Sequence, residues 1–210
     1  MGPRPSLVDP AALLVADAST VINLNATGCA KAILSALPNR LAVVDVVPRE
    51  LELGRRQGRQ NTDLLNELVA ARLVGIVKLD DASARYFEDL VVGSAAMTLD
   101  DGEAATIAYA VEHEGIAIID EKKANRICKE RFPALRVGST VDIFAQVEVE
   151  RALGRERLAQ ALLNALQLAR MSVLPHYTDW VVRVIGPEQA AKCQSLPRSV
   201  RAAWKETVRE

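Results

Sequence analysis

Short, uninterrupted runs of apolar residues recur along the chain and alternate with longer amphipathic stretches. The first run covers residues 13–16 and ends on Asp17. A helix is predicted to follow, beginning near Val21 with Ser19 or Thr20 as its cap. Four further strands are predicted at residues 41–47, 73–79, 116–119 and 135–137. Strands that are apolar at successive positions are typical of a parallel sheet covered on both faces, so the pattern predicts an α/β fold.

The amphipathic stretches predict the helices of this fold. Apolar residues at helical spacing indicate helices within residues 26–37, 63–71, 81–92, 101–113, 141–153 and 155–171, and others are expected after Pro48 and after Asp120. We therefore predict a three-layer sandwich with a central, mainly parallel sheet over residues 11–170. Residues 171–210 change in character and are predicted to form a C-terminal helical extension.

Composition and charge narrow the functional classes. Half of the 210 residues are hydrophobic, which is enough for one sizeable core, and the formal net charge of −1 provides no global attraction to nucleic acid or membrane. The three cysteines form no CxxC pair, which argues against a disulfide scaffold or a zinc site. No apolar run approaches the ~20 residues of a membrane span, and no signal peptide is evident. We expect a cytoplasmic protein.

Acidic residues recur at or just beyond the predicted strand ends. Asp17 and Asp120 directly follow apolar strands, and Glu50 falls just after the second strand. Glu103 opens the helix that leads into the strand before Asp120. Because the carboxyl ends of parallel strands lie along one edge of the sheet, these four carboxylates are expected to converge there.

Each of these acids also has an ordinary structural role open to it. Asp17 could simply cap the next helix, and Glu50 could provide favourable charge at a helix N-terminus. Asp100 and Glu103 have the spacing of a capping box. If this helix begins at another residue than expected, Asp101 could take the place of Glu103 at the edge of the sheet.

The expected convergence of carboxylates predicts a metal site. Four such groups repel one another strongly, and a cluster of this kind persists when a divalent cation neutralises it. Ligation by oxygen alone suits Mg²⁺ or Mn²⁺. The implied chemistry is metal-assisted hydrolysis of a phosphodiester.

Two basic segments are candidates for contact with a phosphate backbone. Arg55 and Arg56 lie in a glycine-flanked polar loop just after Glu50, and Lys122, Lys123 and Arg126 follow Asp120 on a predicted helix. Such residues often form only a solvated surface. Their positions beside the acids favour nucleic acid as the substrate.

Five motifs in this order resemble the PIN-domain family, in particular its branch with an Asp-Xaa-Gly-Glu-Ala motif. They are Asp17-Ala-Ser, Pro48-Arg-Glu-Leu, Leu99-Asp-Asp-Gly-Glu-Ala-Ala, Ile119-Asp120 with its basic helix, and Val137-Gly-Ser-Thr140. The resemblance covers about Leu13 to Leu168. It implies a metal-dependent nuclease, commonly an endoribonuclease toxin of a toxin–antitoxin pair and often a homodimer. It also implies that Asp17, Glu50, Glu103 and Asp120 are the catalytic, metal-binding acids, with Ser19 near the metal water or phosphate.

Other readings remain open from the sequence. A non-catalytic module could keep the fold and use the basic segments to bind RNA or a protein. Phosphatases that form an aspartyl phosphate need a second Asp two positions after the first, where this chain has Ser19. His113 and His176 form no recognisable triad with a serine or cysteine.

Overall fold

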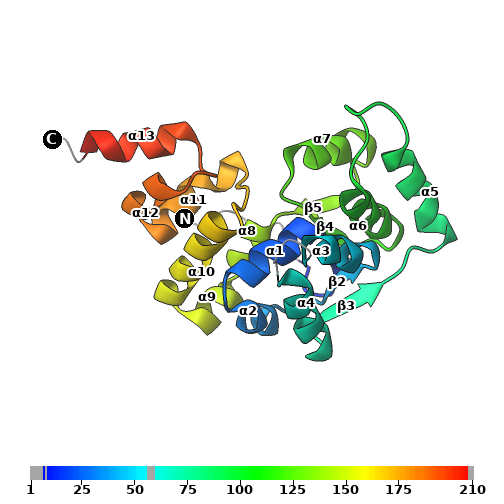
Figure 1. Cartoon of the computed structure of the whole chain (residues 1–210), viewed down its shortest axis with the longest axis horizontal. Helices are drawn as coiled ribbons and strands as arrows, with labels where there is room; N and C mark the ends of the chain where they lie inside the picture. Colours follow the sequence, from blue (N-terminus) through cyan, green and yellow to red (C-terminus); the bar gives the residue numbers. More distant parts are fainter. Residues whose placement is uncertain (1–6, 8, 56–59, 208–210) are drawn as a thin grey trace.

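The computed structural model describes residues 7, 9–55 and 60–207, and its centre is a five-stranded, all-parallel sheet (Figure 1). The strands stand in the order β3-β2-β1-β4-β5. Their bounds are β1 Leu14–Ala16, β2 Leu41–Val44, β3 Val74–Val77, β4 Ile116–Ile118 and β5 Arg136–Gly138. The three-layer α/β architecture predicted from the sequence is thus confirmed, and all described strand pairs are parallel.

Helices connect successive strands and continue beyond the last one. Before β5 they are α1 Ala18–Ala26, α2 Ala30–Ala36, α3 Val46–Arg55, α4 Asn61–Ala70, α5 Asp81–Val91, α6 Asp101–Glu112 and α7 Lys122–Arg131. After β5 they are α8 Thr140–Phe144, α9 Val147–Leu153, α10 Arg155–Leu168, the 3-10 helix η1 Pro175–Tyr177, α11 Thr178–Ile185, α12 Pro187–Lys192 and α13 Arg198–Thr207. Within the described ranges, every helix is too short or too polar to cross a lipid bilayer.

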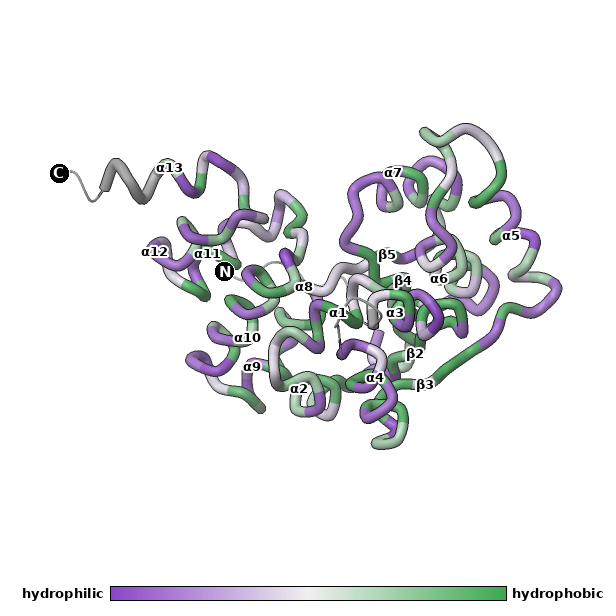
Figure 2. The backbone as a smooth tube through the Cα atoms, in the orientation of Figure 1, coloured by the Kyte–Doolittle hydropathy of each residue, from purple (hydrophilic) through white to green (hydrophobic). Residues whose placement is uncertain are grey.

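Two hydrophobic clusters cover the two faces of the sheet. On one face, Leu14, Val43 and Ile118 pack with α1, α2, α4 and the helices from α8 onwards. On the other face, Val15 and Ala117 pack with α5, α6 and α7. Figure 2 shows hydrophobic residues gathered along the central strands and polar residues on peripheral helices such as α5. Alternate side chains of the inner strands thus enter opposite clusters, which explains why β1, β2 and β4 are apolar and buried throughout. The edge strands β3 and β5 contain exposed residues.

Several helix boundaries differ from the predicted ones. Helix α1 begins at Ala18 because the Asp17 carboxylate, rather than Ser19 or Thr20, caps it. Helix α3 begins at Val46, so Glu50 lies beyond its first turn.

The single helix predicted for residues 141–153 is divided into α8 and α9. The amide side chain of Gln146 donates to the backbone carbonyl of Asp142 at 3.3 Å, while the Gln146 N–H bonds to Ile143 instead. The backbone at Gln146 is extended, with φ −65° and ψ 133°, so α8 ends before this residue and Gln146 takes the N-cap position of α9.

The C-terminal segment packs against the same core as the sheet. Met171, Tyr177, Val181 and Ile185 are buried in the cluster that covers the α1 face. In Figure 1 the C-terminal helices follow α10 along one side of the molecule. The division of the chain after residue 170 stays a prediction, although this segment contributes side chains to the shared core.

Candidate active site at the carboxyl edge of the sheet

Asp17 lies at the carboxyl end of β1 and is only 3% exposed. Its Oδ1 accepts the Thr20 N–H at 2.7 Å, and its Oδ2 accepts the Ser19 hydroxyl at 2.8 Å. These bonds fix the carboxylate at the start of α1, as an N-cap requires. The buried Asp17 side chain is therefore the N-cap of α1.

Asp120 lies just past the neighbouring strand β4 and is 2% exposed. Because β1 and β4 are parallel, with Ala16 beside Ile118, the two aspartates leave the sheet at the same edge. The backbone N–H of Thr140 donates to Asp120 Oδ1 at 2.8 Å, and the Thr140 hydroxyl donates to Oδ2. The side-chain amide of Asn23 donates to the same Oδ2 at 2.7 Å. Asp120 is thus held from two further elements, α1 and α8.

Glu50 reaches the edge from α3, and its carboxylate rests directly on Gly102 of α6. A Cβ built on Gly102 would collide with Glu50 Oε2 and lie only 3.1 Å from the carboxyl carbon. Glu50 Oε2 is buried and has no hydrogen-bond partner among the described residues. A buried, unpaired carboxylate oxygen is costly, which points to a ligand that completes it.

Glu103 lies in the first turn of α6 and is half-buried. The Asp100 carboxylate caps this helix by accepting the Glu103 N–H at 3.0 Å. Helix α6 packs on β1, β2 and β4, so its N-terminus is held at the edge where the strands end. This arrangement places Asp100 and Glu103 near enough to Asp17 for their charges to interact with it.

The pKa values show that the four acids share one electrostatic environment. Burial raises the pKa of Asp17. Burial, followed by the charges of Asp100, Asp17 and Asp101, raises the pKa of Glu50 to about 7. Burial also raises the pKa of Glu103 to about 8 and that of Asp120 to about 7, and the charge of Asp17 contributes to both. Asp17 is therefore the acid that the other three have in common.

These residues fit a divalent cation by their chemistry. The donors are all carboxylate oxygens, and the pKa values of these carboxyl groups are raised by burial and by one another's charge. One oxygen, Glu50 Oε2, is buried without a hydrogen-bond partner among the described residues. In the described part of the chain, no three His, Cys, Asp or Glu side chains already form a metal-binding group. The acids thus line one edge without meeting at a single point.

Comparison with known proteins assigns the family. A family model for the PIN domain matches residues 13–186. The chain belongs to the PIN-domain family. PIN domains are generally nucleases and generally use divalent metals, which agrees with the acidic edge described above. No curated protein and no solved structure matches the chain. The match extends past Leu168 to the end of α11, so it includes the beginning of the C-terminal segment.

Three of the residues predicted to contact phosphate lie around the acids of this PIN domain. Ser19 is exposed and donates to Asp17. Lys122 and Lys123 occupy the first turn of α7, directly after Asp120. The charge of Lys123 lowers the pKa of Glu103 and so opposes the larger effect of burial, which places this lysine near the acidic edge.

The structure places the side chain of only one of the three arginines predicted to contact phosphate. The Arg126 guanidinium donates to the backbone carbonyl of Ala96 at 3.0 Å and forms an ion pair with Glu130 at 3.2 Å. It therefore fastens α7 to the loop before α6. Arg56 lies outside the described residues, and the structure describes Arg55 as the last residue of α3 without its side chain.

Several polar residues of the site were not singled out by the sequence. Thr20 and Asn23 are polar, yet they are buried because they lie on the face of α1 that packs on the core. Polar side chains on a buried helix face were a signal that could have identified them. Thr140 and Gly102 belong to two of the motifs quoted from the sequence, but their contacts with Asp120 and Glu50 were not predicted.

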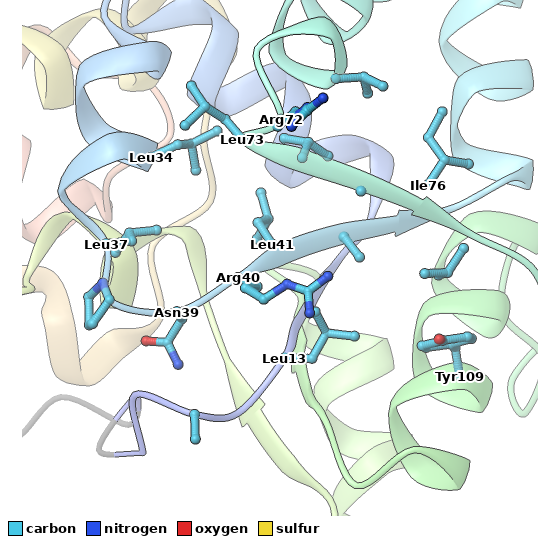
Figure 3. Close-up of a pocket in the computed structure, with 17 residues that line it drawn as sticks. Leu13, Leu34, Leu37, Asn39, Arg40, Leu41, Arg72, Leu73, Ile76 and Tyr109 are labelled. Atoms are coloured by element: carbon cyan, nitrogen blue, oxygen red, sulfur yellow. The ribbon is translucent and has the colours of Figure 1, made fainter.

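A cavity of about 720 Å³ lies away from the acids, at the amino ends of the strands (Figure 3). Leu13, Arg40 and Leu73 immediately precede β1, β2 and β3, and all three line it. Tyr109, from the later part of α6, also contributes. The cavity is thus separate from the acidic site, which lies at the opposite strand ends.

The contact between Gly102 and Glu50 leads to a prediction. Replacing Gly102 by Ala should leave the free energy of unfolding unchanged or raise it, because Ala favours a helix over Gly by up to ~1 kcal/mol and the flexible end of Glu50 can move aside. The displaced carboxylate should lower Mn²⁺ affinity by about tenfold or more. Calorimetric Mn²⁺ titration and thermal unfolding measure the two effects.

Gly75→Ala is a suitable control, since a Cβ there meets only ordinary contacts with Ala42 and Leu41. Unchanged Mn²⁺ affinity in Gly102→Ala would exclude the position of Glu50 as a determinant of cation binding.

Proposed function

We propose that this PIN domain is an endoribonuclease that hydrolyses RNA phosphodiester bonds with Mg²⁺ or Mn²⁺. In this proposal Asp17, Glu50, Glu103 and Asp120 hold the cation. The observation that supports it most strongly is that acids from four separate segments lie along one edge of the sheet. Their pKa values are raised, and a Glu50 oxygen is buried without a hydrogen-bond partner among the described residues.

The chain's own residues prepare this edge for phosphodiester hydrolysis. A bound divalent cation supplies a water of lowered pKa and stabilises negative charge on phosphate oxygens. Thr140 and Asn23 hold the Asp120 carboxylate in one orientation, and Thr20 and Ser19 do the same for Asp17. Fixed carboxylates need little reorganisation when they bind a cation.

The substrate-binding part of the proposal depends on the basic start of α7. Lys122 and Lys123 begin α7 two and three positions after Asp120, and in this proposal they contact phosphates of the bound strand. RNA is proposed as the substrate because the third motif resembles the toxin-like branch of the family. An antitoxin partner and a homodimer are proposed on the same resemblance.

A cleavage assay tests this function. Labelled RNA and DNA of the same sequence are incubated with the protein in Mg²⁺, Mn²⁺ or EDTA. We expect cleavage of RNA with either cation and none in EDTA. Glu103→Gln should lower the rate by about 100-fold, because it removes a charge needed for cation binding.

Glu112→Gln provides the matched control, since Glu112 is exposed at the other end of α6. RNA binding without cleavage in any cation would contradict the nuclease proposal and support a non-catalytic binding module. Cleavage of DNA alone would contradict the proposed substrate.

A further inference from the structure

A series of buried hydrogen bonds connects the C-terminal segment to the start of α8. The Tyr177 hydroxyl, in η1, donates to Asp142 Oδ1. The other carboxylate oxygen of Asp142 accepts the backbone N–H of Ser139 at 2.8 Å and the Ser139 hydroxyl at 2.7 Å. Asp142 and Ser139 thus form the capping box that begins α8.

The next residue along the chain continues this series to the acidic site. Thr140 directly follows Ser139, and its N–H donates to Asp120 Oδ1 at 2.8 Å. Its hydroxyl donates to Asp120 Oδ2. The direction of the Thr140 N–H depends on the backbone at Ser139, which the Asp142 carboxylate holds in place.

All the residues in this series of hydrogen bonds are buried. Tyr177 and Ser139 are each 1% exposed, Asp142 is 2% exposed and Thr140 is fully buried. Hydrogen bonds in a low-dielectric interior are stronger than in water, and a buried donor or acceptor that loses its partner is costly. A change at one end of the series therefore alters the geometry further along it.

The Tyr177 side chain is itself fixed by the fold of the C-terminal segment. Its backbone N–H bonds to the Leu174 carbonyl at 2.9 Å in the turn that forms η1. Its ring lies in the same core cluster as Val181 of α11 and Leu166 of α10. Figure 1 shows α8 between these C-terminal helices and the sheet.

We propose that Tyr177 is a positioning residue for the acidic site. Through Asp142 and Ser139 it orients Thr140, and through Thr140 it orients the Asp120 carboxylate. The segment that begins at residue 171 is therefore part of the active-site structure. The first part of this proposal, that Tyr177 orients Thr140, concerns the protein without a cation. The second part, the effect on cation binding, rests on the proposed function.

Hydrogen exchange on the metal-free protein tests the first part. Tyr177→Phe removes only the hydroxyl, whereas Val181→Ala weakens the same segment without touching the series of bonds. After correction for each variant's free energy of unfolding, we expect the Thr140 amide to exchange about tenfold faster in Tyr177→Phe than in Val181→Ala. The Ile118 amide in β4 should exchange equally in both.

Equal exchange at Thr140 in the two variants would overturn the proposal. If Tyr177→Phe does not fold, Ser139→Ala replaces it, because it removes one donor to Asp142 from the same series. Faster exchange at Thr140 supports the proposal, and exchange equal to that of Val181→Ala overturns it.

Mn²⁺ titration tests the second part. We expect Tyr177→Phe to lower Mn²⁺ affinity by about tenfold or more and Val181→Ala to leave it unchanged. In a Thr140→Val background, Tyr177→Phe should have no further effect, because its action passes through Thr140. Additive losses would overturn the route through Thr140. A wild-type chain that binds no Mn²⁺ would instead contradict the proposed function, and the exchange result would still decide the first part.

Discussion

Replacing Asp17 by Asn is expected to lower RNA cleavage by about 10³-fold, which corresponds to roughly 4 kcal/mol of transition-state stabilisation. After burial, the charge of Asp17 contributes to the raised pKa of Glu50, of Glu103 and of Asp120, so Asp17 interacts with all three. Asn keeps the shape of the side chain and is an equally good N-cap for α1. The variant should therefore fold while losing cation-dependent cleavage.

Cleavage rates with saturating RNA, together with thermal unfolding, measure this prediction. Asp81→Asn is the matched control, because Asp81 is an exposed acid in the first turn of α5. A folded Asp17→Asn protein that cuts RNA at the wild-type rate would exclude Asp17 from the catalytic site.

Raising the pH is expected to destabilise the metal-free protein, and a divalent cation should reverse this effect. The pKa values of Glu50 and Asp120 are raised to about 7 and that of Glu103 to about 8, from ordinary values of 4.5, 3.8 and 4.5. Between about pH 4 and pH 8 the folded chain therefore binds more protons than the unfolded chain. Its free energy of unfolding falls as the pH rises through this window, because ionisation places charges on buried carboxyl groups that also repel one another.

Mn²⁺ should restore stability most strongly at the upper end of this window, where the carboxylates are ionised. At 100 times its dissociation constant a ligand adds about 2.7 kcal/mol, which corresponds to a rise in Tm of roughly 5–10 °C for a chain of this size. Thermal unfolding from pH 5 to pH 9, with EDTA or with Mn²⁺, measures both effects.

The double variant Glu50→Gln/Glu103→Gln serves as the control, because it lacks two of the raised pKa values. Its unfolding should depend less on pH in EDTA and respond little to Mn²⁺. A wild-type protein whose Tm in EDTA rises from pH 5 to pH 8 would contradict the shared electrostatic environment of the acids.

Much of the fold could be predicted because burial on both faces leaves a clear mark in the sequence. The runs at residues 13–16 and 116–119 are apolar throughout, and they form β1 and β4 at the centre of the sheet. Helix boundaries were less accurate. Asp17 caps α1 in place of Ser19, and the extended backbone at Gln146 separates α8 from α9.

The acids could be proposed from the sequence because strand ends in a parallel sheet share one edge. The residues that hold these acids by hydrogen bonds could not be predicted, since Thr140 lies 20 positions from the Asp120 carboxylate that it contacts. Asn23 reaches the same carboxylate from 97 positions away. The bond from Arg126 to the Ala96 carbonyl spans 30 positions, and no local pattern indicates it.

The sequence alone determined the order of strands and helices, the burial of the sheet on both faces and the placing of Asp17 and Asp120 at strand ends. These properties follow from local periodicity, which records how much of each residue is buried. The tertiary structure alone decided that the Glu50 carboxylate packs against Gly102 and that the Tyr177 hydroxyl donates to Asp142. Such contacts depend on which surfaces meet after the chain has folded, and periodicity records the degree of burial without naming the partner.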